Sequence, residues 1–293
     1  MSRQRLLQAV SSKMIWKSSS RSLDLTRRSQ VMGILNVTPD SFSDGGRYAD
    51  TAQALTHARR MIAEGAEIID IGGESTRPGS LPVGAEDEIE RTLGIITALR
   101  AEWDGWISID TSKAAVAHAA LAAGADIVND VSGLRADPEM AAVCAASGCA
   151  VVVMHMCGAP RTMQNAPFYQ NVVEDVKNFF ATRMVELMSA GIQLESLCFD
   201  PGIGFGKNLD HNLALLQNLA SLAPAGRPLL LGVSRKSFIG KILGDDDLKL
   251  RDWPTVAITA QAREMGVLLH RVHDVRPNVE ALRMTEAILG AGG

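Results

Sequence analysis

The stretch VMGILNVTPDSFSDGG, residues 31–46, joins a continuous apolar run to a polar loop. Its apolar half shows no alternation of polar and apolar residues, which is typical of a strand buried on both faces, as in a parallel sheet. The run ends at Asn36, and proline and glycine residues then punctuate a segment that contains Phe42 and Asp44. We therefore expect a buried strand that delivers Asn36 to a functional loop. The alternative is a solvated connection with Phe42 tucked beneath it.

The same unit recurs eight times along the chain: an apolar run, a polar loop and a helical stretch. The expected strands are residues 31–36, 67–71, 107–110, 127–130, 151–155, 197–200, 229–232 and 268–272. The expected helices are residues 51–64, 86–102, 113–123, 138–147, 172–190, 211–222, 255–265 and 279–289. Buried strands that alternate with helices pair in parallel through right-handed crossovers, and eight of each predict an α/β fold, a (β/α)8 TIM barrel.

The chain is interpreted as a lead at residues 1–13 followed by a single barrel domain at 14–293. Two short apolar segments, 14–16 and 23–25, flank SSSRS and predict an N-terminal hairpin that covers the barrel floor. A transit peptide is the alternative for the Arg-, Lys- and Ser-rich head. Glycines between helices and strands predict left-handed helix ends. They are Gly65, Gly124, Gly148, Gly191 and Gly266.

Composition favours a globular enzyme that acts on small molecules. Hydrophobic residues make up 46% of the chain and charged residues 21%, which is an ordinary globular balance. The net charge of −4 argues against a general nucleic-acid surface. The four cysteines form no CxxC pair and are expected to be reduced thiols. No apolar run approaches the roughly 18 residues of a membrane span, so we expect no membrane partner and a cytoplasmic location.

Polar residues stand where each predicted strand ends. In chain order they are Asn36, Glu74 to Pro78, Asp110, Asn129 with Asp130, His155, Asp200, Ser234 to Ser237, and Arg271 with His273. The strand ends of a (β/α)8 barrel meet at one mouth, where active sites lie. Four of these residues have a structural alternative. Asp110 could cap the helix that follows it, and Asp200 could form the turn before Pro201 and Gly202. His155 and His273 could be satisfied scaffold histidines.

The motifs around these positions resemble the dihydropteroate synthases, the folate-pathway enzymes that sulfonamides inhibit. They are MGILNVTPDSFSDGG, IDIGGESTRPGS, ISIDTS, AGADIVNDVSG, VVVMHM, FDPGIGFGKNLDHN, GVSRKSFIG and HRVHDV, and the match runs over residues 14–289. The resemblance implies a (β/α)8 barrel that joins 6-hydroxymethyl-7,8-dihydropterin pyrophosphate to p-aminobenzoate, releasing pyrophosphate and 7,8-dihydropteroate. It also implies a homodimer, to which the last two helices could contribute an interface.

The pterin site that the resemblance implies fits simple chemistry. A pterin presents a ring N–H beside an exocyclic amine, and a buried carboxylate can accept both hydrogen bonds. Asp200 is the candidate for that carboxylate, while the remaining pterin contacts implied by the resemblance are Asp110, Asn129, Met154 and Lys236. The residues expected to act on the reacting centre are Asp110, Lys236, Asp44 and Arg77.

The leaving group requires cations, which Arg271 and His273 supply from one strand. By resemblance, Asn36 and Thr76 complete the pyrophosphate site, and Asn36 holds a Mg²⁺ ion that keeps most of its waters. The aminobenzoate site implied by the family comprises Phe42, Pro78, Phe205, Lys236 and Ser237. The loops that contain Phe42, Asp44, Thr76, Arg77 and Pro78 would close as a lid and exclude water.

In the implied reaction, pyrophosphate leaves first, the pterin delocalises the resulting cation, and the amine then attacks. Two alternatives remain open: a pterin-binding methyltransferase domain of the same barrel type, and a catalytically silent paralogue. Residues 245–247 are interpreted as a solvated surface loop, and Pro254, where the family often has glycine, is expected to begin a helix.

Overall fold

The computed structural model describes residues 13–38, 46–75, 80–158, 163, 167–245 and 247–290, with backbone only at 46–50 and 225. Eight parallel strands form one sheet in the order β8-β7-β6-β5-β4-β3-β10-β9. They are β3 (Gln30–Asn36), β4 (Ile68–Gly72), β5 (Trp106–Asp110), β6 (Ile127–Asp130), β7 (Ala150–Met154), β8 (Leu197–Asp200), β9 (Leu230–Leu231) and β10 (Leu269–Val272). A parallel bridge between Phe199 and Leu229 joins the two edges. The predicted (β/α)8 barrel is confirmed, and every predicted strand agrees with the observed one to within a residue at each end.

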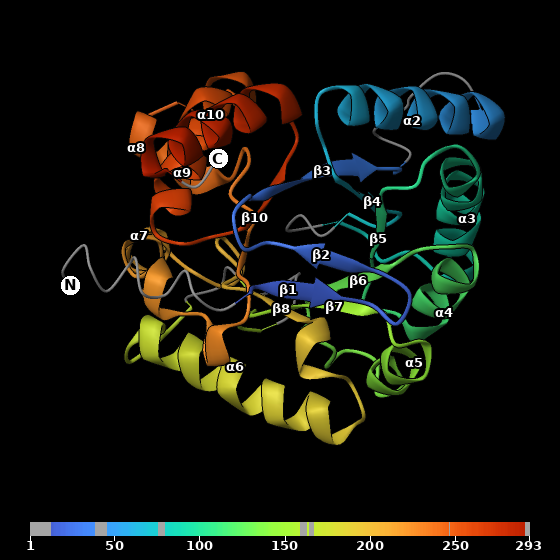
Figure 1. Cartoon of the computed structure of the whole chain (residues 1–293), viewed down its shortest axis with the longest axis horizontal. Coiled ribbons are helices and arrows are strands. Elements are labelled where there is room, and N and C mark those ends of the chain that lie inside the picture. The colour runs from blue at the N-terminus through green and yellow to red at the C-terminus, as the bar shows by residue number, and fades with distance from the viewer. Residues whose placement is uncertain are drawn as a thin grey trace.

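Helices surround the barrel (Figure 1). They are α2 (Gly46–Ala63), α3 (Ala85–Glu102), α4 (Ala114–Ala122), α5 (Met140–Ser147), α6 (Val172–Ser189), α7 (Leu209–Gln217), α8 (Ser237–Leu243), α9 (Asp252–Glu264) and α10 (Val275–Leu289). Among the described residues, four short 3₁₀ turns lie between these helices: η3 (Leu194–Ser196), η4 (Leu219–Ser221), η5 (Pro224–Gly226) and η6 (Leu248–Arg251). None of the helices in the described ranges has the length and apolar character needed to cross a bilayer.

One helix was not predicted, and α2, α7, α9 and α10 each begin or end three or more residues from the predicted bounds. Helix α8 was not predicted, because its seven residues follow a strand-end loop and are too few to show a helical period. The helix predicted over 211–222 ends at Gln217, after which η4 tightens the turn. Helix α10 begins four residues earlier than predicted, since Pro277 lies in its first turn, where a backbone N–H has no intrahelical acceptor.

Local sequence explains where several elements begin and end. The side chain of Asn171 accepts hydrogen bonds from Val173 N and Glu174 N and so caps α6. Asn208 and His211 form a reciprocal capping box at the start of α7. Gly148 ends α5 with φ +64°, and the other four glycines predicted at helix ends also have positive φ.

Alternate residues of each strand face two different cores. In β4, Ile69 and Ile71 belong to the large cluster between sheet and helices, whereas Ile68 belongs to a second cluster inside the barrel. By the same alternation Asp70 and Gly72 face the barrel interior. Side chains of strand-end residues that share this parity therefore enter the mouth.

The predicted hairpin closes the opposite end of the barrel. Strands β1 (Ile15–Lys17) and β2 (Ser22–Asp24) pair antiparallel and lie across the barrel (Figure 1). Trp16 is fully buried, stacks on Trp106 with ring centroids 6.1 Å apart, and donates its indole N–H to Ser196 O at 2.8 Å. The apolar floor that the sequence predicted is thus confirmed.

Candidate active site

Arg271 is the central cation of the mouth. Strand β10 carries it into the barrel, where its Nε donates to Asp70 Oδ2 at 2.6 Å and its Nη2 donates to Asp110 Oδ2 at 2.7 Å. Burial alone would lower the pKa of the guanidinium, but the two carboxylates raise it above its usual value. Arg271 is therefore a fixed positive charge held by β4 and β5.

Asp110 ends β5 and carries a strongly perturbed carboxyl group. Burial raises its pKa to about 7, with Arg271 opposing the shift and Asp70 adding to it. The alternative role as a helix cap is wrong. The start of α4 is held instead by Thr111 Oγ1, which accepts from Lys113 N at 3.2 Å, and by Asp137 Oδ2, which accepts from Ala114 N at 2.8 Å.

Asp70 is a member of the cluster that the sequence reasoning missed. It is fully buried, and its Oδ2 accepts from Asn129 Nδ2 at 3.1 Å as well as from Arg271. Its Oδ1 and the neighbouring Ser108 Oγ have no hydrogen-bond partner within the described ranges. A carboxylate inside the apolar run IIDIG was a signal available in the sequence, because a lone charge in a buried strand requires a partner.

Asp200 and Lys236 form the other side of the mouth. Asp200 Oδ1 accepts from Gly202 N at 2.7 Å, and burial raises the pKa of the carboxyl group, opposed by Lys236. Lys236 Nζ donates to Ile203 O and lies 4.5 Å from the centre of the Phe205 ring. Burial lowers the pKa of Lys236 to about 8 against the pull of Asp200.

Two glycines show how close the two halves of this cluster lie. A Cβ placed on Gly232 would lie 3.7 Å from Asp200 Oδ2 and 3.8 Å from Arg271 Cβ. A Cβ on Gly72 would lie 3.7 Å from Asn36 Oδ1 and 3.8 Å from Asp110 Oδ2. The structure thus brings together predicted strand-end residues from five different strands: Asn36, Asp110, Asn129, Asp200 and Arg271.

The remaining described candidates lie around this cluster. His273 follows β10 directly, and its Nδ1 lies 2.9 Å from Ser234 Oγ, which also accepts from His273 N at 3.2 Å. Met154 ends β7 and belongs to a small apolar cluster against which Phe205 packs. Ser237 is the first residue of α8.

Two strand-end residues serve the scaffold. His155 Nδ1 lies 3.0 Å from Lys207 Nζ, and burial lowers the pKa of the imidazole to about 2, so the ring is neutral. Asp130 accepts from Ser132 N, Ser132 Oγ and Leu134 N and holds the turn after β6. The contacts of His155 therefore fit its alternative role as a scaffold histidine.

Five predicted site residues lie outside the described part of the chain: Phe42, Asp44, Thr76, Arg77 and Pro78. Glu74, which precedes Thr76 in the loop after β4, lies within the described residues. There Lys113 Nζ donates to Glu74 and also, at 2.5 Å, to Glu88 Oε2, a fully buried carboxylate.

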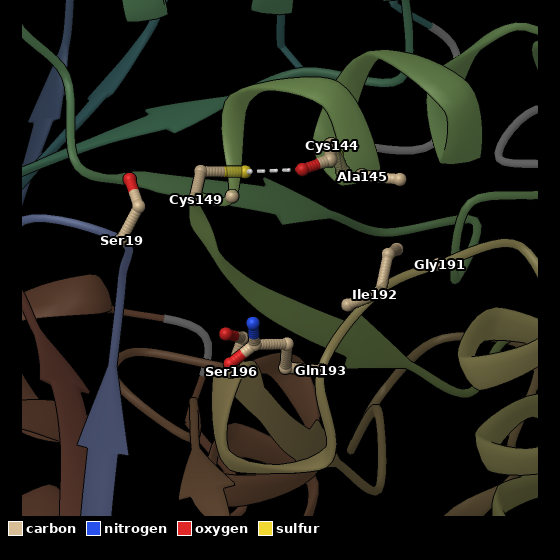
Figure 2. A pocket seen from close by; sticks show the side chains of 9 residues that line it. Ser19, Cys144, Ala145, Cys149, Gly191, Ile192, Gln193 and Ser196 are labelled. Carbon is tan, nitrogen blue, oxygen red and sulfur yellow. Dashed lines mark hydrogen bonds between the residues drawn. The ribbon is translucent and has the colours of Figure 1, made fainter.

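A cavity of about 60 Å³ lies at the floor end of the barrel, between the hairpin, α5 and the segment before η3 (Figure 2). Its lining includes Ser19, Cys149 and Gln193, and Cys149 Sγ faces Cys144 O at 3.9 Å. The volume suits a few water molecules rather than a substrate. Because it lies at the N-terminal ends of the strands, this cavity is no candidate for the active site.

Comparisons with known proteins agree with the geometry. The family model described as pterin binding enzyme matches residues 32–273. Dihydropteroate synthase of Escherichia coli K12 is 46% identical over 270 residues, which cover 92% of this chain and 95% of the relative. Its counterpart from Synechocystis is also 46% identical, over 90% of this chain and 92% of the relative.

Solved structures extend the likeness to three dimensions. Yersinia pestis dihydropteroate synthase, in a sulfonamide drug complex, superposes with a TM-score of 0.88 at 44% identity, covering 94% of this chain and 100% of that one. Xanthomonas albilineans dihydropteroate synthase with 4-aminobenzoic acid gives 0.88 at 42% identity, with 95% and 99% covered. Burkholderia cenocepacia dihydropteroate synthase complexed with 7,8-dihydropteroate gives 0.85 at 42% identity, with 95% and 98% covered.

Proposed function

This chain belongs to the pterin-binding enzymes and, within them, to the dihydropteroate synthases, and on that basis we propose how the barrel mouth works. The enzyme joins 6-hydroxymethyl-7,8-dihydropterin pyrophosphate to p-aminobenzoate. The bond from the pterin methylene carbon to the pyrophosphate oxygen breaks. A bond from that carbon to the aniline nitrogen forms, and the nitrogen loses a proton. The observation that supports this site is the convergence of Asp200, Asp110 and Arg271 at the strand ends.

The pterin ring would lie against Asp200, with Asn129 and Met154 beside it. Gly202 N already binds one carboxylate oxygen, and Gly232, which has no side chain, flanks the other. A ring N–H and an exocyclic amine donating to the carboxylate would favour its ionised form and offset the effect of burial on its pKa. Lys236, held over Phe205, would cover the ring on the side of the reacting carbon.

The pyrophosphate would bind to Arg271 and His273 at the end of β10, with Asn36 and Thr76 beside them. Two of the Arg271 nitrogens donate to Asp70 and Asp110. An incoming phosphate would therefore share the guanidinium with Asp110 or release this carboxylate toward the developing pterin cation. Stabilising the departing charge and then the cation is the electrostatic part of catalysis.

Asn36 fits a Mg²⁺ site of the kind expected from the sequence. Its amide oxygen is a hard donor close to Asp110, and Mg²⁺ commonly takes one or two protein oxygens with substrate phosphates and waters. Within the described ranges, groups of three or more His, Cys, Asp or Glu able to hold a metal are absent. When bound, the ion would neutralise charge on the leaving pyrophosphate.

The aminobenzoate would bind between Phe205, Lys236 and Ser237 and the two loops that contain Phe42 and Pro78. Sulfonamides would compete for the same place, in keeping with the Yersinia relative that was solved with such a drug. Ordering of the loops by pyrophosphate and Mg²⁺, with Asp44 and Arg77 as the linking charges, would form this pocket only after the first substrate binds.

A second copy of the chain is the proposed partner. Trp253 of α9 and Ile288 of α10 are 77% and 78% exposed, and Leu248 and Leu250 of η6 are about half exposed. These elements contact one another at one side of the barrel, and large exposed apolar side chains gathered in this way are typical of interfaces. Light scattering should give the mass of a dimer, and Trp253→Glu should shift it toward the monomer. The cytoplasmic location stays a prediction.

Pyrophosphate release in the presence of both substrates tests the function. The assay should detect release that depends on the pterin pyrophosphate, on p-aminobenzoate and on Mg²⁺. A pterin-binding methyltransferase domain would release none, and a silent paralogue would bind the pterin without turnover. Pterin binding without release under these conditions would contradict the proposal.

A further inference from the structure

The loop after β8, residues 201–208, packs its backbone directly on the chain that follows β7. Gly202 has φ +66°, and a Cβ there would lie 1.9 Å from His155 O. Gly206 has φ +64°, and a Cβ there would lie 2.3 Å from Cys157 O. Both contacts require glycine. The junction of these two segments is thus built from close-packed backbone whose carbonyl groups need donors.

The side chain of Lys207 returns into this junction and supplies those donors. Its Nζ lies 3.0 Å from Gly202 O, 3.1 Å from Phe205 O and 3.2 Å from His155 O, with His155 Nδ1 at 3.0 Å. Lys207 is only 2% exposed and, among the described residues, makes no salt bridge. Its ammonium is therefore solvated by three carbonyl dipoles and a neutral imidazole, which together can use all three of its protons.

Each residue that binds this ammonium also holds part of the mouth. Gly202 N donates to Asp200 Oδ1 at 2.7 Å, and His155 N donates to Asp200 O at 2.9 Å. Phe205 places its ring 4.5 Å from Lys236 Nζ. The ammonium thus connects the backbone around the Asp200 carboxylate with Phe205, a wall of the proposed aminobenzoate pocket.

We infer that Lys207 is a positioning residue for the condensation: its ammonium fixes the loop so that Asp200 and Phe205 face their substrates. The inference rests on the proposed roles of those two residues. Burial lowers the pKa of Lys207 to about 7, with Lys236 adding to the shift and Asp200 opposing it. The three carbonyl groups accept hydrogen bonds from the ammonium, and loss of its charge would weaken these hydrogen bonds.

Other contacts hold the same loop from outside and provide a matched control. Tyr169 Oη donates to Gly206 O at 2.9 Å, and Gly204 N donates to Asn212 Oδ1 at 2.7 Å. Neither contact reaches Asp200 or Phe205. If the loop needs only to be anchored, then losing the Tyr169 contact should matter as much as losing the ammonium.

The test measures binding of 6-hydroxymethylpterin by calorimetry to the full chain. Lys207→Ala should keep the circular dichroism of the barrel and lose about tenfold or more in affinity, because three carbonyls lose their charged donor. It should also raise KM for p-aminobenzoate. Tyr169→Phe should stay within about twofold of the native affinity. Equal losses in the two variants, or an unchanged Lys207→Ala, would overturn the inference.

Rescue by a soluble amine separates positioning from general stability. Propylammonium should restore at least part of the pterin affinity of Lys207→Ala, while the bulkier tert-butylammonium should not. No rescue by either would contradict the role of the charge. If Lys207→Ala does not fold, Lys207→Gln, which keeps two donors without the charge, is measured instead and should lose more pterin affinity than Tyr169→Phe. A loss no larger than that of Tyr169→Phe would overturn the inference. Asp200→Asn is measured in parallel: an unchanged affinity there would refute the proposed site itself, rather than the role of Lys207.

Discussion

The two ends of the barrel are built from the same strands but differ in how their polar groups are satisfied. At the floor, Asp126 accepts from Arg100 Nη2 at 2.5 Å, from Arg21 Nη1 at 3.3 Å and from Ile107 N at 2.9 Å. The Trp16 indole has both a stacking partner and a hydrogen-bond acceptor. These groups have their partners within the chain, whereas Gln30 Oε1, at the start of β3, is buried and has no hydrogen-bond partner among the described residues.

At the mouth the balance is different. Asp70 Oδ1 is buried with no hydrogen-bond partner in the described ranges. Burial also favours the uncharged forms of two side chains: it raises the pKa of Asp110 and lowers the pKa of Lys236. Such groups cost stability unless a ligand satisfies them. The comparison teaches that the floor supplies stability, while the mouth is prepared for charged and hydrogen-bonding substrates.

The largest expected effect is on the floor. Trp16→Ala removes a fully buried ring and its hydrogen bond to Ser196 O, which should lower the free energy of unfolding by about 3–5 kcal/mol. Denaturant titration measures this loss. Pterin affinity of the folded variant should stay within about twofold of native. A large loss of affinity would show that the two ends are coupled, contrary to the comparison.

Arg271→Ala should have the largest expected effect on ligand binding at the mouth. The change leaves Asp70 and Asp110 without their cation, and it should weaken binding of the pterin pyrophosphate by about 1.5–3 kcal/mol more than binding of free hydroxymethylpterin. His273→Ala should show the same preference. Calorimetry with both ligands decides, and equal losses would place these residues on the ring or in the scaffold.

Binding order should show a coupling of about 1–3 kcal/mol, or roughly 5- to 150-fold in affinity. A sulfonamide should bind detectably only when pyrophosphate and Mg²⁺ are present, and Arg77→Ala should reduce this dependence. Fluorescence or calorimetric titration with and without pyrophosphate measures it. Equal sulfonamide affinity in both conditions would mean that the pocket is preformed, and the proposed lid would be wrong.

A further expected effect is a pH dependence of stability due to Asp110. Because its pKa in the folded state is raised to about 7, the folded chain holds a proton that the unfolded chain releases near pH 4. Stability from this group is therefore present at low pH and is lost as the pH rises from about 4 to about 7. Relative to Asp110→Asn, the native protein should lose stability across that window. A constant difference would show that Asp110 does not titrate in this range.

The sequence predicted the strands better than the site. In a chain where strands alternate with helices, a continuous apolar run such as residues 31–35 predicts a buried parallel strand. The residues at the ends of these runs then predict where the barrel mouth lies. Helix α8 was missed because seven residues carry little periodicity. Asp70 was not predicted because it lies inside an otherwise apolar strand and not at the strand end.

Lys207 could not have been identified from the chain alone. Within FDPGIGFGKNLDHN it looks like an ordinary loop lysine, and such residues are usually exposed. Its burial depends on the close approach of the β7 and β8 loops, which is a tertiary contact. The same limit applies to His155, whose contacts with Lys207 decided between two readings that the sequence left open.

The most direct test of the mouth as the pterin site is the affinity of Asp200→Asn for 6-hydroxymethylpterin, measured by calorimetry beside the native protein. An amide cannot accept both ring hydrogens and carries no charge, so the affinity should fall by roughly 10- to 150-fold, which corresponds to about 1.5–3 kcal/mol, with the fold retained. An affinity that stays within about twofold of native would contradict the account.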